Sequence, residues 1–178
     1  IGPGADHDSL ERHLGDRFDP EQEQVICVCA VGYASAYVPL FIRVFSRGMR
    51  RRQPAEALFF SDESLGVPLD LGGPGVGRFS QVLEACRWGP SSYNGQTTRA
   101  VVQVGAAGAV HSVGFCAVTA SRFYAPVAVG IWLANWERGC AALGIEGDVV
   151  LTPEVGSHRG TEPPWFDARW VPRGAALG

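Results

Sequence analysis

The chain has 178 residues, of which 46% are hydrophobic and 19% are charged, and its formal net charge is -3. These values predict one globular domain with a sizeable core and argue against nucleic-acid binding by bulk electrostatics. No apolar run reaches the roughly 20 residues that a membrane-spanning helix needs, so we expect a cytoplasmic protein with no membrane partner. The cysteines lack zinc-type spacing and suit small buried hydrophobes in a reducing compartment, and no metal site is expected. They are Cys27, Cys29, Cys86, Cys116 and Cys140.

The first third of the chain is expected to hold a short helix and a central strand. Asp8–Leu14 has a helical pattern that Gly15 can end, and the charged surroundings of His7 and His13 place both on the surface. Val25–Val31 is an uninterrupted apolar run of strand length. A strand that is apolar on both faces suits a sheet covered by helices on each side.

A basic segment, Arg50-Arg51-Arg52-Gln53-Pro54, follows the apolar stretch 37–45. The apolar stretch can cover the core or a partner surface, and the sequence does not decide between them. Adjacent guanidiniums offer forked donors that suit the oxygens of a phosphate, while a solvated basic loop is the alternative. Residues 61–77 are rich in Gly, Pro, Ser and Asp, which predicts a linker.

A polar turn lies between a predicted helix and a predicted strand. The preceding apolar residues recur at steps of three and four, and Gly89-Pro90 then stops the helix. Residues 91–96 include two serines, an Asn and a Gln, which can present hydrogen bonds to a planar ligand with polar edges. The apolar residues of the helix are Val76, Phe79, Val82, Leu83 and Cys86.

Two strands and a long helix follow. Residues 99–104 and 110–118 read as strands joined by a hairpin turn at 105–108. Residues 125–143 are apolar nearly all round, which is typical of a buried helix or of one shared with a second subunit. The residues after 150 show no periodicity.

The polar turn resembles the R-x-x-P-S-x-x-N-x-Q signature of flavin-dependent nitroreductases. The matching residues are Arg87, Pro90, Ser91, Asn94 and Gln96. The family pattern continues with Pro-Trp, where this chain has Thr97-Thr98. Two further features have counterparts in the family, in the same order: the Gly32-Tyr33 pair followed by the basic segment, and the helix ending at 137–147. An ordinary helix-ending loop is the alternative explanation of the turn.

The resemblance implies an α+β fold with a central mixed or antiparallel sheet, flanking helices and a long buried central helix. Residues 1–178 are then one nitroreductase-like domain of the single-chain pseudo-dimer type. It divides into the end of a first half-module (25–60), a linker (61–77), a second half-module (78–150) and an irregular tail (151–178). The family's Arg-x-Ser-x-Arg element has no match before Val25, so we expect a missing first half-module. The chain alone is accordingly expected to bind FMN weakly or not at all and to self-associate, with a homodimer or pseudo-dimer as the complete form.

The activity that the resemblance implies is reduction of nitroaromatic or quinone-like acceptors by NAD(P)H through bound FMN. Arg50, Arg51 and Arg52 are expected to neutralise the flavin phosphate. Pro90, Ser91 and Ser92 would contact the ring or the ribityl edge, and Asn94 and Gln96 would hold the loop and the polar rim of the ring. No protein residue is assigned to catalysis, because the protein's share of such chemistry is positioning and tuning the flavin. The alternatives are a non-catalytic binding or assembly module with this fold, and an enzyme that consumes its flavin.

Overall fold

The structure is a computed structural model, and it describes residues 7–19, 21–23, 31–33, 37–48, 51–105, 108–119, 124–151 and 165–174. The chain divides into two compact units, Ile1–Ile42 and Arg43–Gly178. Helix α1 (His7–Leu14) and the 3-10 helix η1 (Gly15–Arg17) belong to the first unit, and helix α2 (Leu40–Gly48) spans the boundary. The predicted helix over 8–14 is confirmed, and Gly15 follows it with a φ of 54°.

The strand predicted at Val25–Val31 lies outside the described residues except for its last member. Val31 is 97% exposed and belongs to no strand.

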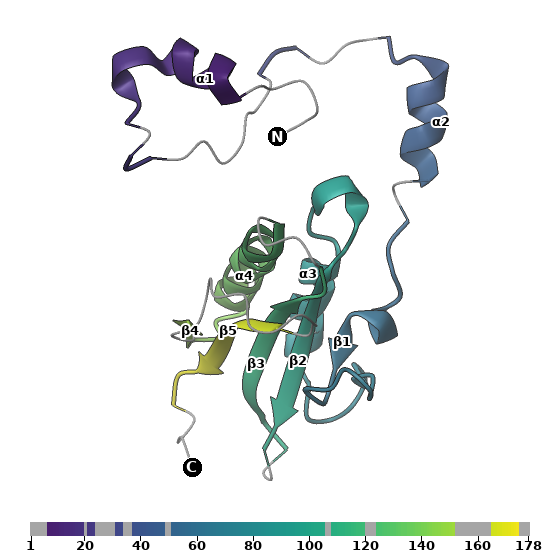
Figure 1. The fold of residues 1–178 in the computed structure, drawn as a ribbon. Coiled ribbons are helices and arrows are strands. Elements are labelled where there is room, and N and C mark those ends of the chain that lie inside the picture. The colour runs from purple at the N-terminus through teal and green to yellow at the C-terminus, as the bar shows by residue number, and fades with distance from the viewer. Residues whose placement is uncertain are drawn as a thin grey trace. The chain divides into compact units, whose positions relative to one another are not determined.

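The described part of the second unit contains one five-stranded sheet, in the order β1-β2-β3-β5-β4 (Figure 1). The strands are β1 (Phe59–Phe60), β2 (Thr98–Val104), β3 (Val110–Ala117), β4 (Gly147–Leu151) and β5 (Trp165–Pro172). β1 pairs with β2 in parallel, and the other three pairings are antiparallel. The expectation of an α+β protein with a mixed sheet is therefore confirmed.

The predicted hairpin forms as β2 and β3. Its register pairs Thr98 with Ala117 and Val102 with Val113, with an irregularity near Val104. Both faces of this pair are buried, which explains why the strands read as nearly continuous apolar runs. On the face opposite the main core, Ser112 donates a 2.8 Å hydrogen bond to Gln103, whose side chain donates in turn to Glu63 at 3.1 Å.

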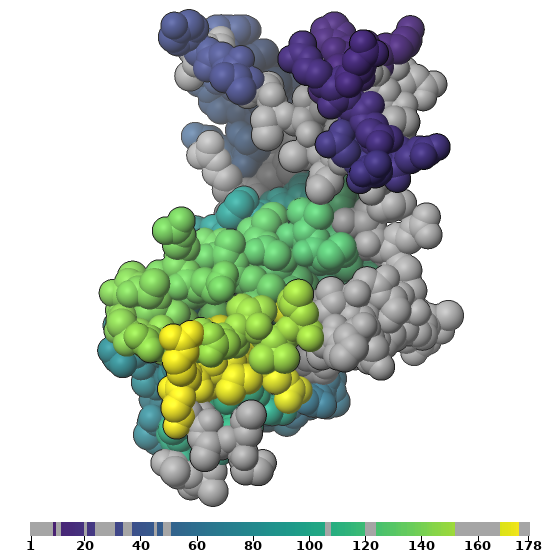
Figure 2. All heavy atoms as spheres, turned by 90° about the vertical axis from the view of Figure 1, so that its left-hand side faces the viewer, coloured from purple at the N-terminus to yellow at the C-terminus, as the bar shows by residue number. Residues whose placement is uncertain are grey.

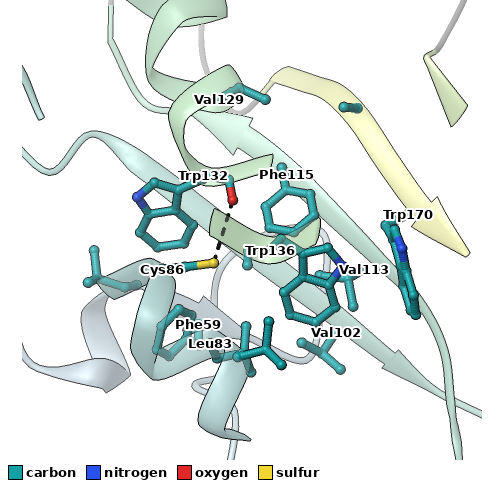
Figure 3. Packing of buried hydrophobic residues seen from close by; sticks show 14 of the residues in the cluster. Phe59, Leu83, Cys86, Val102, Val113, Phe115, Val129, Trp132, Trp136 and Trp170 are labelled. Atoms are coloured by element: carbon teal, nitrogen blue, oxygen red, sulfur yellow. Dashed lines mark hydrogen bonds between the residues drawn. The ribbon is translucent and has the colours of Figure 1, made fainter. Parts of the chain in front are cut away.

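Two helices, α3 (Phe79–Arg87) and α4 (Tyr124–Ala142), contribute to the main core with one face of the sheet (Figure 3). Trp136 lies at the centre of an aromatic cluster, with ring centroids 5.4 Å from Trp170 and 5.5 Å from Phe115. Its indole nitrogen is buried without a hydrogen-bond partner. Cys86 of α3 lies 3.6 Å from the carbonyl of Trp132 on α4, so a side-chain contact joins the two helices.

The prediction of a helix at 125–143 packed against the sheet is confirmed, and the structure buries only one side of it. Its buried positions follow one stripe, whereas Val127, Gly130 and Ala134 are exposed on the other side. The outer side of α4 is visible in green in Figure 2. The reason is geometric, because a helix laid on one face of a sheet can bury only the stripe that faces it. The buried positions are Ala125, Val129, Trp132, Trp136 and Cys140.

The expectation of an irregular tail over 151–178 also needs correction. Leu151 ends β4, and β5 lies between β3 and β4 in the sheet. Ala168 and Trp170 are each 1% exposed, while the intervening Arg169 is half-buried, which is the alternation of a strand with one face in the core.

The segment over 61–77 forms turns, and two of its side chains pack into the hydrophobic core. Leu69 and Val76 belong to the hydrophobic core, 8% and 3% exposed. The division into half-modules stays a prediction. Of the five cysteines, Cys86, Cys116 and Cys140 are described, and all three are buried, whereas Cys27 and Cys29 lie outside the described residues.

Candidate functional site

The candidate site begins where α3 ends. Arg52 reaches this helix end and donates from Nη1 to the Gly89 carbonyl at 2.9 Å and from Nη2 to the Trp88 carbonyl at 3.0 Å. The last carbonyls of a helix lack partners inside the helix, and a positive charge there is favourable. Arg52 therefore attaches the basic segment to the C-terminus of α3.

The loop after Gly89 has an unusual backbone conformation. Tyr93, Asn94 and Gln96 have φ values of 51°, 53° and 47°, in the left-handed region that residues other than glycine rarely adopt. Ser91 stabilises the turn, because its carbonyl accepts from Asn94 N–H at 3.0 Å and its hydroxyl accepts from Gln96 N–H at 3.1 Å. Strain at three positions of one short loop persists only where the surroundings fix it.

Two side-chain amides fix this loop against the basic segment. The Gln96 side chain accepts from the Gln53 N–H at 2.8 Å and donates to the Arg51 carbonyl at 2.9 Å. The Asn94 side chain donates to the same Arg51 carbonyl at 2.8 Å. We call these three hydrogen bonds the amide clamp. Gln96 is only 6% exposed, so its amide is a buried polar group, and its hydrogen-bond partners lie in the segment about 45 residues earlier.

A charged cluster lies beside the clamp. Arg87 donates to Glu84 through Nε at 2.7 Å and Nη2 at 2.6 Å, and it donates to the Gln53 carbonyl at 3.0 Å. The Trp88 indole N–H also donates to Glu84, at 2.7 Å. The hydrogen bonds from Arg87 lower the pKa of Glu84, and the same contact raises the pKa of Arg87. Two guanidiniums of the site lie over the Trp88 ring, Arg87 at 5.1 Å and Arg52 at 5.8 Å from its centroid.

The structure brings together the two sets of residues that sequence analysis assigned to flavin, apart from Arg50, which lies outside the described residues. They divide by exposure. Gln96 is buried, and Arg52, Ser91 and Asn94 are half-buried, whereas the exposed members are Arg51, Pro90 and Ser92.

Two exposed aromatic residues of this surface were missed in the sequence analysis. Trp88 is 58% exposed and Tyr93 is 74% exposed, at the start and in the middle of the loop. The signal available in the sequence was two aromatic residues within a polar, helix-ending stretch, where core packing does not call for them.

The exposed groups can bind an anion and a planar ring. The Arg51 guanidinium supplies forked donors, the Ser92 hydroxyl supplies a neutral one, and Trp88 and Tyr93 supply aromatic faces. Among the described residues, no three His, Cys, Asp or Glu side chains are grouped so that they could hold a metal ion.

Comparisons with protein-family models, with curated proteins and with solved structures found no match. In the described part of the chain, no helix combines the length and the apolar character needed to cross a membrane. The resemblance of the polar turn to the nitroreductase signature accordingly stays a prediction.

Proposed function

We propose that this chain belongs to an FMN-dependent oxidoreductase of the nitroreductase type, which uses NAD(P)H to reduce nitroaromatic or quinone-like acceptors. One observation carries the proposal. The basic segment and the polar turn were assigned to the same ligand from separate sequence features, and the amide clamp joins them into one surface. The buried Gln96 amide makes its hydrogen bonds across the two loops, which supports a specific pairing of them.

The residues of the surface divide into those that bind and those that position. Arg51 takes the phosphate, because its guanidinium is exposed while its carbonyl is fixed by the clamp. Ser91 and Ser92 face the ribityl or ring edge. Gln96 and Asn94 position the loop, and Arg52 positions the segment, because their side chains donate hydrogen bonds to the protein's own backbone.

The donor set fits FMN at its phosphate end and at a ring face. The chemistry that FMN supplies when bound is hydride acceptance from NAD(P)H and electron delivery to the acceptor. The contribution of this chain is to hold the cofactor in a fixed orientation and to place a positive charge beside its phosphate. A loop already fixed before binding reduces the conformational entropy that binding costs.

The test is a titration of the purified chain with FMN, followed by absorbance, with NAD(P)H and then a nitroaromatic added without oxygen. The proposal predicts saturable binding of FMN, bleaching of the flavin spectrum by NAD(P)H, and return of the colour with the acceptor. The same chain carrying Gln96→Leu, which removes two of the three clamp bonds, should bind FMN more weakly. Since the chain alone is expected to bind FMN weakly or not at all, the titration is repeated with an upstream segment carrying an Arg-x-Ser-x-Arg element joined to the chain. Failure of both chains to bind FMN, or equal binding with and without Gln96→Leu, would sink the proposal.

A second candidate is a non-catalytic binding or assembly module. The observation that favours it is that Arg52, Asn94 and Gln96 use their donors within the protein. The same titration separates the two candidates. Saturable FMN binding without bleaching by NAD(P)H, or preferential binding of another planar anion, supports the module and excludes the reductase.

A further inference from the structure

Helix α2 separates apolar and basic side chains around its axis. At about 100° per residue, Leu40, Val44, Phe41 and Ile42 fall within an arc of roughly 200°. Their exposed fractions are 72%, 62%, 73% and 44%, so none of these four side chains is buried in the structure. The remaining arc carries both arginines of the helix and one serine, at positions 43, 47 and 46, with both arginines on the side next to Leu40.

The charge around α2 has a single sign. No Asp or Glu occurs between Glu23 and Glu56, although the whole chain has a net charge of -3. The same interval holds five arginines, two on the helix and three directly after it. The exposed Tyr37, at 76%, precedes the helix. Clusters of four to eight basic residues on or beside an amphipathic helix are typical of segments that bind anionic lipid headgroups.

We propose that α2 lies flat on an anionic lipid surface, with Leu40, Phe41 and Val44 inserted among the headgroups and Arg43 and Arg47 bound to lipid phosphates. Charge complementarity decides the occupant. A helix held in a protein groove needs a narrow stripe of anchors, whereas here more than half of the circumference is apolar. Long arginine side chains at the border of such an arc can extend their charge to the headgroups while their stems stay apolar.

The expectation of no membrane partner came from the absence of a spanning helix, and a surface helix needs no such length. The nine residues of α2 extend about 13 Å, which lets the helix lie in the headgroup region but is far too short to cross the membrane. The inference does not require the proposed function, because the lipid contacts are assigned to Arg43 and Arg47. The three arginines at 50–52, which the proposed function assigns to FMN, only add to the positive charge beside the helix.

The experiment is co-sedimentation of the full chain with vesicles of phosphatidylcholine alone and of phosphatidylcholine mixed equally with phosphatidylserine. We expect binding to the mixed vesicles only, and weaker binding as salt is raised. Each arginine near an anionic surface contributes about five-fold to binding, so Arg43→Gln/Arg47→Gln should lower the partition coefficient by about 30-fold. The matched control, Arg17→Gln/Arg138→Gln, removes the same charge from two other exposed sites and should have a far smaller effect.

A second pair tests the apolar arc and guards against misfolding. Phe41→Ser/Val44→Ser should abolish vesicle binding without changing the free energy of unfolding. The control Val127→Ser/Val150→Ser replaces two side chains that are 46% and 50% exposed, and it should also leave the free energy of unfolding unchanged. Three results would overturn the proposal. The first is equal binding to both kinds of vesicle, or binding to neither. The second is a loss of stability in Phe41→Ser/Val44→Ser alone, which would mean that the apolar arc packs against the chain's own body. The third is self-association that this pair of substitutions abolishes, which would mean that a second copy of the chain covers the arc.

Discussion

Replacing Gln96 by Leu tests whether the amide clamp holds the candidate site together. The change removes both clamp bonds of this side chain, at 2.8 and 2.9 Å, and a longer bond of 3.3 Å to the Asn94 carbonyl. Leucine has nearly the same volume, so little cavity forms. The partners on Arg51 and Gln53 are part-buried and lose a hydrogen bond each.

The magnitude follows from these bonds. A net contribution of about 1 kcal/mol for each short bond gives a loss of about 2 kcal/mol, and incomplete hydration of the freed groups raises it to about 3 kcal/mol. Urea unfolding measures this as a fall in the midpoint at constant slope. The control is Gln81→Leu on the exposed side of α3, which should stay within about 0.5 kcal/mol of the parent chain. A Gln96→Leu chain as stable as this control would refute the clamp.

The remaining stability and reactivity predictions use other groups. In urea unfolding, Asn94→Ala should lower the free energy of unfolding by about 1–2 kcal/mol more than Asn94→Gly does. Both variants lose the clamp bond, but of the two residues only glycine adopts a φ of 53° without strain. Equal losses in the two variants would contradict a strained loop. The pKa of Glu84 is lowered by Arg87, so the stability that Glu84→Gln removes is present at pH 7 and should vanish as the pH falls below 4.5, the ordinary value; a difference that persists in acid would be inconsistent with this pair. Burial raises the pKa of Cys86 to about 12 and of Cys140 to about 11, so neither thiol should react with a disulfide reagent at pH 8 until the chain unfolds. Rapid labelling of Cys86 or Cys140 in the folded chain, located by peptide mapping, would contradict their burial.

The elements that the sequence predicted correctly have strong local signals. Strands β2 and β3 are runs of apolar and β-branched residues around a Gly-rich turn. Helix α4 is a long apolar segment whose one proline, Pro126, lies in the first turn, where a helix tolerates it. Strand β1 has only Phe59 and Phe60, which is too short for any periodicity. Strand β5 does carry an alternation at Ala168 and Trp170, but it follows a Pro- and Gly-rich stretch that obscured it.

The candidate site was predictable only in part. The Ser, Asn and Gln residues of the turn predicted a polar loop able to bind a ligand. The resemblance to the nitroreductase signature linked this loop with the basic segment. The sequence could not show that Arg52 contacts the end of α3, because that contact depends on how two segments 36 residues apart fold together. Nor could it separate the positioning role of Gln96 from a ligand-binding one, because burial decides between them.

The most direct test of the account is the affinity of the Arg51→Ala chain for FMN and for riboflavin, which lacks the phosphate. The substitution leaves the Arg51 carbonyl in place, so the clamp stays intact. Loss of a charge-assisted contact of about 1–3 kcal/mol predicts FMN binding weaker by about five- to 150-fold. Riboflavin binding should hardly change, and Arg138→Ala should leave both affinities as they are. Equal losses for the two flavins, or no loss for FMN, would contradict a phosphate site at Arg51.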